Sequence, residues 1–99
     1  MDTRTRYQEL IKQILRSHVE PFEPIDPNIQ DRLVFDDEHN TYAIIRVGWK
    51  TIDDLIYGVI AHVDMIGDKI WVQHDNTEDG IAYELVDAGV PREHIVLGF

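Results

Sequence analysis

Residues 55–75 read LIYGVIAHVDMIGDKIWVQHD. An apolar run fills residues 55–65, and a shorter run at residues 69–74 follows it. The pair Gly67 and Asp68 between the two runs is typical of a two-residue turn with a positive backbone φ. We therefore predict a β-hairpin at this point, and this hairpin leads directly into a helix.

The turn sets the pairing of the hairpin. With Gly67 and Asp68 in the loop, Asp64 faces Trp71, His62 faces Gln73, and Asp75 lies diagonal to His62. One predicted face is apolar and belongs to the core: it carries Val59, Ala61, Val63, Met65, Ile70 and Val72. The other face is polar around one large aromatic, which suits a surface that meets a partner: it carries His62, Asp64, Trp71, Gln73 and Asp75.

The segments before this hairpin predict a helix and a second hairpin. An amphipathic stripe predicts a helix over residues 3–18, with Thr3 or Thr5 as its cap. Three prolines then indicate an extended connector: Pro21, Pro24 and Pro27. Period-two alternation from Gln30 to Asp36 and from Thr41 to Trp49 predicts the strands of the additional hairpin.

The segment after the hairpin predicts a second helix. Asn76 or Thr77 is its expected cap, and Gly89 followed by Pro91 is a typical end signal. A short strand is expected over residues 95–99. The resulting order αββββα indicates an α+β fold, in which helices pack on one face of an antiparallel sheet of two hairpins.

The length and composition of the chain limit the classes of function that it can have. A chain of 99 residues supports one core, so residues 1–99 are expected to form a single domain, and its thin stability margin favours a homo-oligomer. The chain has 9 Lys and Arg against 19 Asp and Glu, a net charge of −10, which disfavours direct binding to nucleic acid. It has no cysteine for a disulfide or thiolate site. Neither a signal sequence nor a membrane-spanning run is evident, so we expect a cytoplasmic protein.

The polar face of the hairpin is the candidate site. His62 with Asp64 or Asp75 has the residue types of a divalent metal site or an acid and base pair. Such residues on a strand more often form surface hydrogen bonds, and Asp75 also fits a helix cap, so we expect no catalytic residue, metal or cofactor. Trp71 is a typical interface anchor. We therefore predict a protein interface made of His62, Asp64, Trp71, Gln73 and Asp75, and no enzyme.

Several segments carry a family resemblance: IWVQHDNTEDGIA at residues 70–82, ELV at residues 84–86 and GVPREHIVLGF at residues 89–99. Further matches are LVFD at residues 33–36 with Tyr42, VGW at residues 47–49 and IYG at residues 56–58. Together they resemble the XisI-like family, the fdxN element excision controlling factors of cyanobacteria. The resemblance covers nearly the whole chain.

The resemblance implies an accessory or regulatory protein for the site-specific excision of a DNA element. Its implied partner is a XisH-like protein or a recombinase, and an acidic protein suits a basic partner. Two alternatives stay open. One is an immunity or antitoxin-type inhibitor of a nuclease-like partner, and the other is a small metal-dependent enzyme that uses His62 with Asp64 or Asp75.

Overall fold

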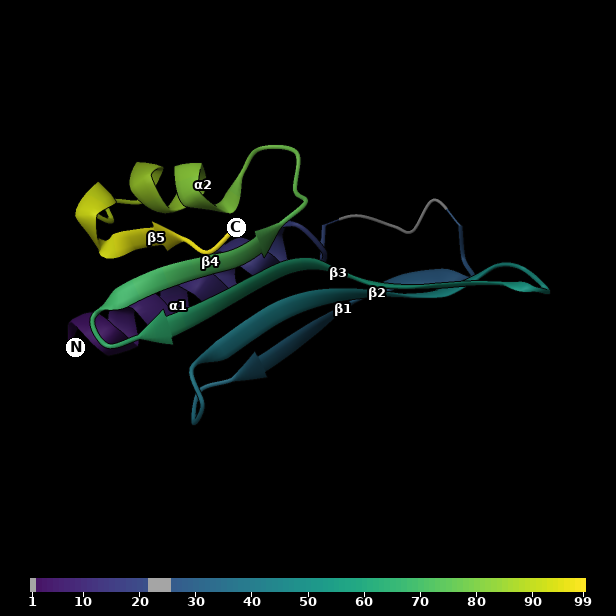
Figure 1. Cartoon of the computed structure of the whole chain (residues 1–99), viewed down its shortest axis with the longest axis horizontal. Helices are drawn as coiled ribbons and strands as arrows, with labels where there is room; N and C mark the ends of the chain where they lie inside the picture. Colours follow the sequence, from purple (N-terminus) through teal and green to yellow (C-terminus); the bar gives the residue numbers. More distant parts are fainter. Residues whose placement is uncertain (1, 22–25) are drawn as a thin grey trace.

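The computed structural model describes residues 2–21 and 26–99, so Pro24 of the predicted connector lies outside the described residues. The elements follow in the order α1 (Thr3–Ser17), β1 (Ile29–Asp36), β2 (Thr41–Thr51), β3 (Asp54–Ile66), β4 (Lys69–Asp75), α2 (Ile81–Asp87), a 3-10 turn (Arg92–His94) and β5 (Ile95–Leu97) (Figure 1). The strands form one sheet in the order β1-β2-β3-β4-β5. Among the described strands, only β4 and β5 pair in parallel. The predicted α+β class is confirmed.

Both helices pack on one face of the sheet, called here the inner face, and the opposite face is called the outer face. α1 contacts β1 and β2, α2 contacts β4, and the two helices also contact each other. The core between these layers consists mainly of Tyr7, Ile11, Ile14, Leu15, Tyr42, Ile44, Ala61, Val63, Met65, Ile70, Val72, Ile81, Leu85 and Val90. No helix of the described residues covers the outer face.

The start of α1 differs from the predicted cap. The carboxylate of Asp2 accepts a hydrogen bond from the backbone N–H of Thr5 at 2.7 Å, so Asp2 is the N-cap, and Thr3 and Thr5 lie inside the first turn. The negative charge of an aspartate at this position also interacts favourably with the positive end of the helix dipole. The helix ends at Ser17, with His18 as its C-cap.

A bulge in β3 changes which face Val59 occupies. Ile44 pairs with Ala61, but the next residue of β2, Ile45, pairs with Val59, so Ile60 is an extra residue in β3. An extra residue shifts the alternation of side chains by one. The prediction that Val59 lies in the core is therefore wrong: its side chain is on the outer face and 43% exposed, while Ile60 packs against the core.

A second bulge lies in β4. The predicted pairing holds from Ile66 opposite Lys69 to Val63 opposite Val72. Beyond it, His62 faces His74, and Ala61 faces Asp75, which leaves Gln73 as the extra residue. The prediction that His62 faces Gln73 is therefore wrong, and so is the placement of Asp75 on the polar face. Asp75 is paired with the core residue Ala61 and lies on the inner face.

Asp75 organises the start of α2 from that position. Its Oδ2 accepts a hydrogen bond from the N–H of Ile81 at 2.7 Å, and its Oδ1 accepts one from the N–H of Thr77 at 3.0 Å. The Thr77 hydroxyl in turn accepts from the N–H of Gly80 at 3.3 Å. The helix begins at Ile81 with Gly80 as its N-cap, so the predicted caps Asn76 and Thr77 lie before the helix, in the segment that these contacts hold.

Two polar contacts attach α1 to other parts of the fold. Asp37, in the turn between β1 and β2, accepts hydrogen bonds at 2.8 Å from the Lys12 ammonium and from the Tyr42 hydroxyl. Burial, reinforced by the Asp37 carboxylate, raises the pKa of Tyr42, so this hydroxyl stays protonated and donates. The Tyr7 hydroxyl is hydrogen bonded to Nδ1 of His94 at 2.7 Å, which joins α1 to the turn before β5.

The sheet is longer than the layer of helices. The distal part of the β2–β3 hairpin, residues 45–59, extends beyond both helices, and we call it the arm (Figure 1). The molecule measures 47 × 24 × 23 Å along its principal axes. β1 accompanies the arm only as far as the pair of Ile29 with Gly48, and beyond it the hairpin has two strands.

Replacing Asp37 tests the link between α1 and the sheet. The hydrogen bonds from Lys12 and then Tyr42 lower the pKa of Asp37, so its carboxylate stabilises the fold above the unfolded pKa of about 3.9, and this stabilisation is lost as pH falls through the folded pKa. The Asp37 side chain is 55% exposed, so screening keeps the effect small. We expect Asp37→Asn to lower the free energy of unfolding by less than about 1 kcal/mol at about pH 7.

Urea unfolding at about pH 7 and about pH 3 measures this difference, which should shrink at the lower pH. Glu38→Gln, an exposed change in the same turn, is the matched control. A destabilisation of equal size at both pH values would contradict the assignment.

Replacing Asp75 tests the start of α2. Asp75→Ala leaves the N–H groups of Thr77 and Ile81 without their acceptor, so we expect it to destabilise the fold by about 0.5–2 kcal/mol. Asp75→Asn keeps one acceptor oxygen and should cost less. Thermal unfolding followed by circular dichroism measures both variants, with Asp79→Ala, an exposed change in the same turn, as the control. Equal effects of Asp75→Ala and Asp79→Ala would rule out this capping role.

Candidate functional site

Four of the five predicted site residues lie together on the outer face. We call His62, Asp64, Trp71 and Gln73 the polar cluster. His62 and Asp64 are two residues apart in β3 and so share a face, and Trp71 in β4 is directly opposite Asp64. The fifth predicted residue, Asp75, does not join them, because its carboxylate is on the inner face at the start of α2.

Asp64 is the centre of the polar cluster. Its Oδ1 lies 2.9 Å from Nε2 of His62, and its Oδ2 accepts a hydrogen bond from the Gln73 amide at 3.3 Å. The His62 side chain is 36% exposed and that of Asp64 is 20% exposed. Asp64 is therefore a partly buried carboxylate with both oxygens engaged, held in one orientation at the protein surface.

The bulge in β4 supplies the third member of this network. As the extra residue, Gln73 lies where it can reach Asp64 along the outer face. The C-terminal segment packs closely against it, because the N–H of Gly98 donates to the carbonyl of Val72 and a Cβ at residue 98 would overlap the Gln73 side chain. The Gly98 position thus leaves room for the Gln73 amide.

Trp71 lies beside this network. It is half-buried, and its cross-strand neighbours are Asp64 on β3 and Val96 on β5. An aromatic side chain in this setting has its ring partly fixed by the sheet and still presents an apolar surface to solvent. The polar cluster therefore combines an ordered carboxylate with an aromatic anchor.

One residue of this surface escaped the sequence reasoning. His74 pairs with His62 across β3 and β4 and is exposed. Strict alternation after the turn would put His74 on the inner side with Ile70 and Val72, and the bulge at Gln73, which reverses this, has no local sequence signal. The outward position of His74 follows from its pairing with His62, and this pairing depends on the bulge.

The structure does not bring the predicted metal ligands together. His62 and Asp64 are together, but Asp75 is on the other side of the sheet and is occupied by backbone N–H groups. Within residues 2–21 and 26–99, no group of three or more His, Asp or Glu side chains is arranged to hold a metal ion. A metal site made of His62 with Asp75 is therefore wrong for this fold.

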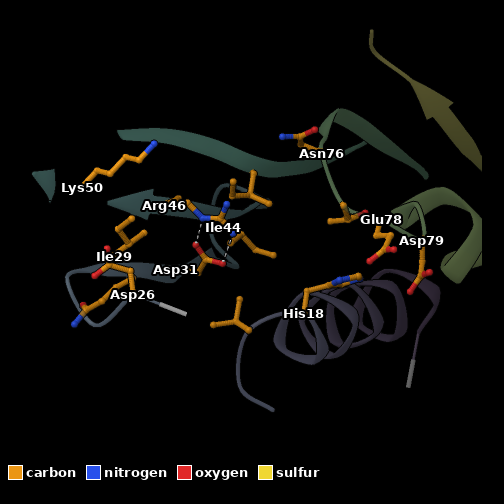
Figure 2. A pocket seen from close by; sticks show the side chains of 14 residues that line it. His18, Asp26, Ile29, Asp31, Ile44, Arg46, Lys50, Asn76, Glu78 and Asp79 are labelled. Atoms are coloured by element: carbon orange, nitrogen blue, oxygen red, sulfur yellow. Dashed lines mark hydrogen bonds and ion pairs between the residues drawn. The ribbon is translucent and has the colours of Figure 1, made fainter. Parts of the chain in front are cut away.

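A wide hollow lies elsewhere, on the inner face between the end of α1, the first strands and the turn before α2 (Figure 2). It has a volume of about 1020 Å³ and is lined by side chains of both charge signs, among them His18, Asp31, Arg46, Lys50, Glu78 and Asp79. Arg46 binds both carboxylate oxygens of Asp31, at 2.8 and 3.1 Å. His18 is paired with Glu84. These lining residues come from many separate elements, so no sequence motif indicated the hollow.

No described helix is long and apolar enough to cross a membrane. The comparisons with known proteins then identify relatives of the whole chain. No curated protein matches it. A solved XisI-like protein from Anabaena variabilis ATCC 29413 is 39% identical, with 96% of this chain and 85% of that chain covered and a TM-score of 0.88.

A second solved structure, the fdxN element excision controlling factor XisI from the same organism, is 28% identical. The match covers 99% of this chain and 93% of that chain, with a TM-score of 0.86. The family model described as XisI protein matches residues 1–99. The chain therefore belongs to the XisI family, as its sequence resemblance indicated.

Proposed function

We propose that this protein is a regulatory factor of the excision-controlling type and that it acts by binding another protein. The chain belongs to the XisI family, and one solved relative is described as an excision controlling factor. The proposed partner is a XisH-like protein or a recombinase that acts in the site-specific excision of a DNA element. The role is regulatory and needs no catalytic residue in this chain.

The polar cluster is the observation that carries this proposal. Trp71 offers apolar area at a low cost in side-chain entropy, and Asp64 is already held by His62 and Gln73. A partner that binds here does not have to order these side chains, which removes part of the entropic cost of association. Interfaces commonly combine such an aromatic anchor with oriented polar groups around it.

Charge supports a basic protein partner. The net charge of −10 repels a phosphate backbone and attracts a basic surface, and it would speed the encounter with a basic protein at low salt. A recombinase or nuclease that binds DNA has such a surface. The division of labour we propose leaves DNA contact to the partner and regulation to this chain.

Two further parts complete the proposal. We place the protein in the cytoplasm, where a partner that acts on chromosomal DNA would be found. We also propose that it forms a homo-oligomer, because a domain of 99 residues buries a small share of its surface by itself.

Co-purification with the product of the neighbouring gene tests the partner proposal. We expect Trp71→Ala and Asp64→Lys each to weaken the complex by about tenfold or more, because an interface anchor contributes about 2 kcal/mol or more. Tyr83→Ala is the matched control, since Tyr83 is an aromatic of α2 that is 74% exposed. Binding should also weaken as salt is raised.

Two results would count against this proposal. Affinity unchanged in both outer-face variants would exclude the polar cluster as the binding surface. Toxicity of the partner when expressed alone, relieved by this chain, would instead favour the immunity-type alternative.

A further inference from the structure

The arm carries a continuous apolar strip on the outer face. Three cross-strand pairs form it: Ile45 with Val59, Val47 with Tyr57, and Trp49 with Leu55. Paired residues share a face, and alternate residues of one strand share it too, so all six side chains point the same way. We call these six residues the arm strip. It lies on the same face as the polar cluster and shares β3 with it, but its other strand is β2, whereas that of the polar cluster is β4.

The arm strip is unusually exposed for its composition. Tyr57 is 71% exposed, Leu55 57%, Trp49 51% and Val59 43%. The bulge at Ile60 contributes to this, because it turns Val59 away from the core. No described helix reaches the arm, so nothing in the described chain covers this surface (Figure 1). Long apolar strands that face water on a protruding hairpin are a liability unless another surface covers them.

The area of the arm strip fits an interface of standard size. With about 150–250 Å² for an aromatic side chain, and less for an aliphatic one, the exposed fractions leave on the order of 500 Å² of apolar surface. A standard interface buries about 800 Å² on each partner, of which about 60% is apolar. The strip therefore supplies about the apolar area that one partner needs.

The charges around the arm strip favour a second copy of this chain. The chain has 19 acidic residues, yet none of the six positions is acidic, so two strips can meet without repulsion between carboxylates. At the inner end of the strip, Arg32 pairs with Ile45 on the same face. At the tip of the arm lie Asp53 and Asp54, close to the far end of the strip.

A two-fold arrangement places these opposite charges together. The levels of Ile45 and Thr51 are about 20 Å apart along the strand, at about 3.3 Å per residue. If two strips stack face to face with reversed strand direction around an axis near Gly48, the level of Ile45 in each copy meets the level of Thr51 in the other, and Arg32 meets the acidic tip. Such an isologous contact closes after two copies.

We propose that the arm strip is the interface of a homodimer, in which two arms pack face to face and Arg32 of each copy meets the Asp53 and Asp54 tip of the other. This inference rests on the self-association part of the proposed function and gives it a surface. The arm consists of β2 and β3 alone, so Trp71 and Gln73 on β4 stay available in both copies, and the dimer would present two partner-binding surfaces. Avidity for a partner with two copies of its own site would follow from this geometry.

Sedimentation equilibrium of the full chain tests the proposal. The wild-type protein should show twice the chain mass of 11.5 kDa at micromolar concentration. Tyr57→Asp should raise the dimer dissociation constant by about 100-fold or more, because it places a charge at the centre of an apolar interface. Tyr83→Asp on α2 is the matched control and should leave the dimer intact, and thermal unfolding of each variant verifies its fold.

A charge exchange gives a readout that a folding defect cannot mimic. Arg32→Asp alone should weaken the dimer, and so should the double change Asp53→Arg and Asp54→Arg. Combining all three changes in one chain should restore the association, since the opposite charges then meet again with signs reversed. Restoration would support the two-fold arrangement, and additive weakening would overturn it.

The remaining outcomes separate this inference from the proposed partner binding. A monomeric wild-type protein, or a dimer that Tyr57→Asp leaves unchanged, would overturn the dimer interface. If the wild type is monomeric and Tyr57→Asp loses capture of the neighbouring gene product, the strip binds that partner instead. If Tyr57→Asp is monomeric and still captures the partner, both the dimer interface and a separate partner site are supported.

Discussion

The pairing of β3 with its two neighbours is the constraint on which this fold depends. Side chains alternate strictly along a strand, so one extra residue reverses every position beyond it. β3 takes part in two bulges. In its pairing with β2 the extra residue is Ile60 of β3, and in its pairing with β4 the extra residue is Gln73 of β4. The first turns Val59 outward onto the arm. The second turns Asp75 inward, where its carboxylate holds the start of α2, and places Gln73 beside Asp64.

The same constraint divides the outer face into two regions with different chemistry. Over β3 and β4 the surface is polar and internally hydrogen bonded around Asp64. Over the arm strip it is apolar and contains no carboxylate. A small chain that places both helices on one side of its sheet leaves the other side available for binding. The two regions are suited to different surfaces, one to a charged partner and one to a matching apolar strip.

Local signals predicted most of the sheet. The Gly67 and Asp68 turn gave the correct pairing for its nearest four pairs, and core positions such as Val63 and Met65 followed from it. The errors begin where the bulges do. Val59 and Asp75 were assigned to the wrong faces, because a bulge depends on which residues of two strands hydrogen bond and leaves no periodic trace in either strand. The α2 start was placed too early for the same reason, since its acceptor is a strand residue that only the bulge turns inward.

The hydrogen bond between Tyr7 and His94 bears on how this protein folds during synthesis. It spans 87 positions of the chain, and β5 just beyond it pairs in parallel with β4. Contacts of such large sequence separation form slowly, because the chain loses conformational entropy in closing the loop before the contact stabilises it. Tyr7 at the start of α1 therefore lacks this partner until His94 has left the ribosome. Nascent chains stalled before that point would be the ones most exposed to chaperones and proteases.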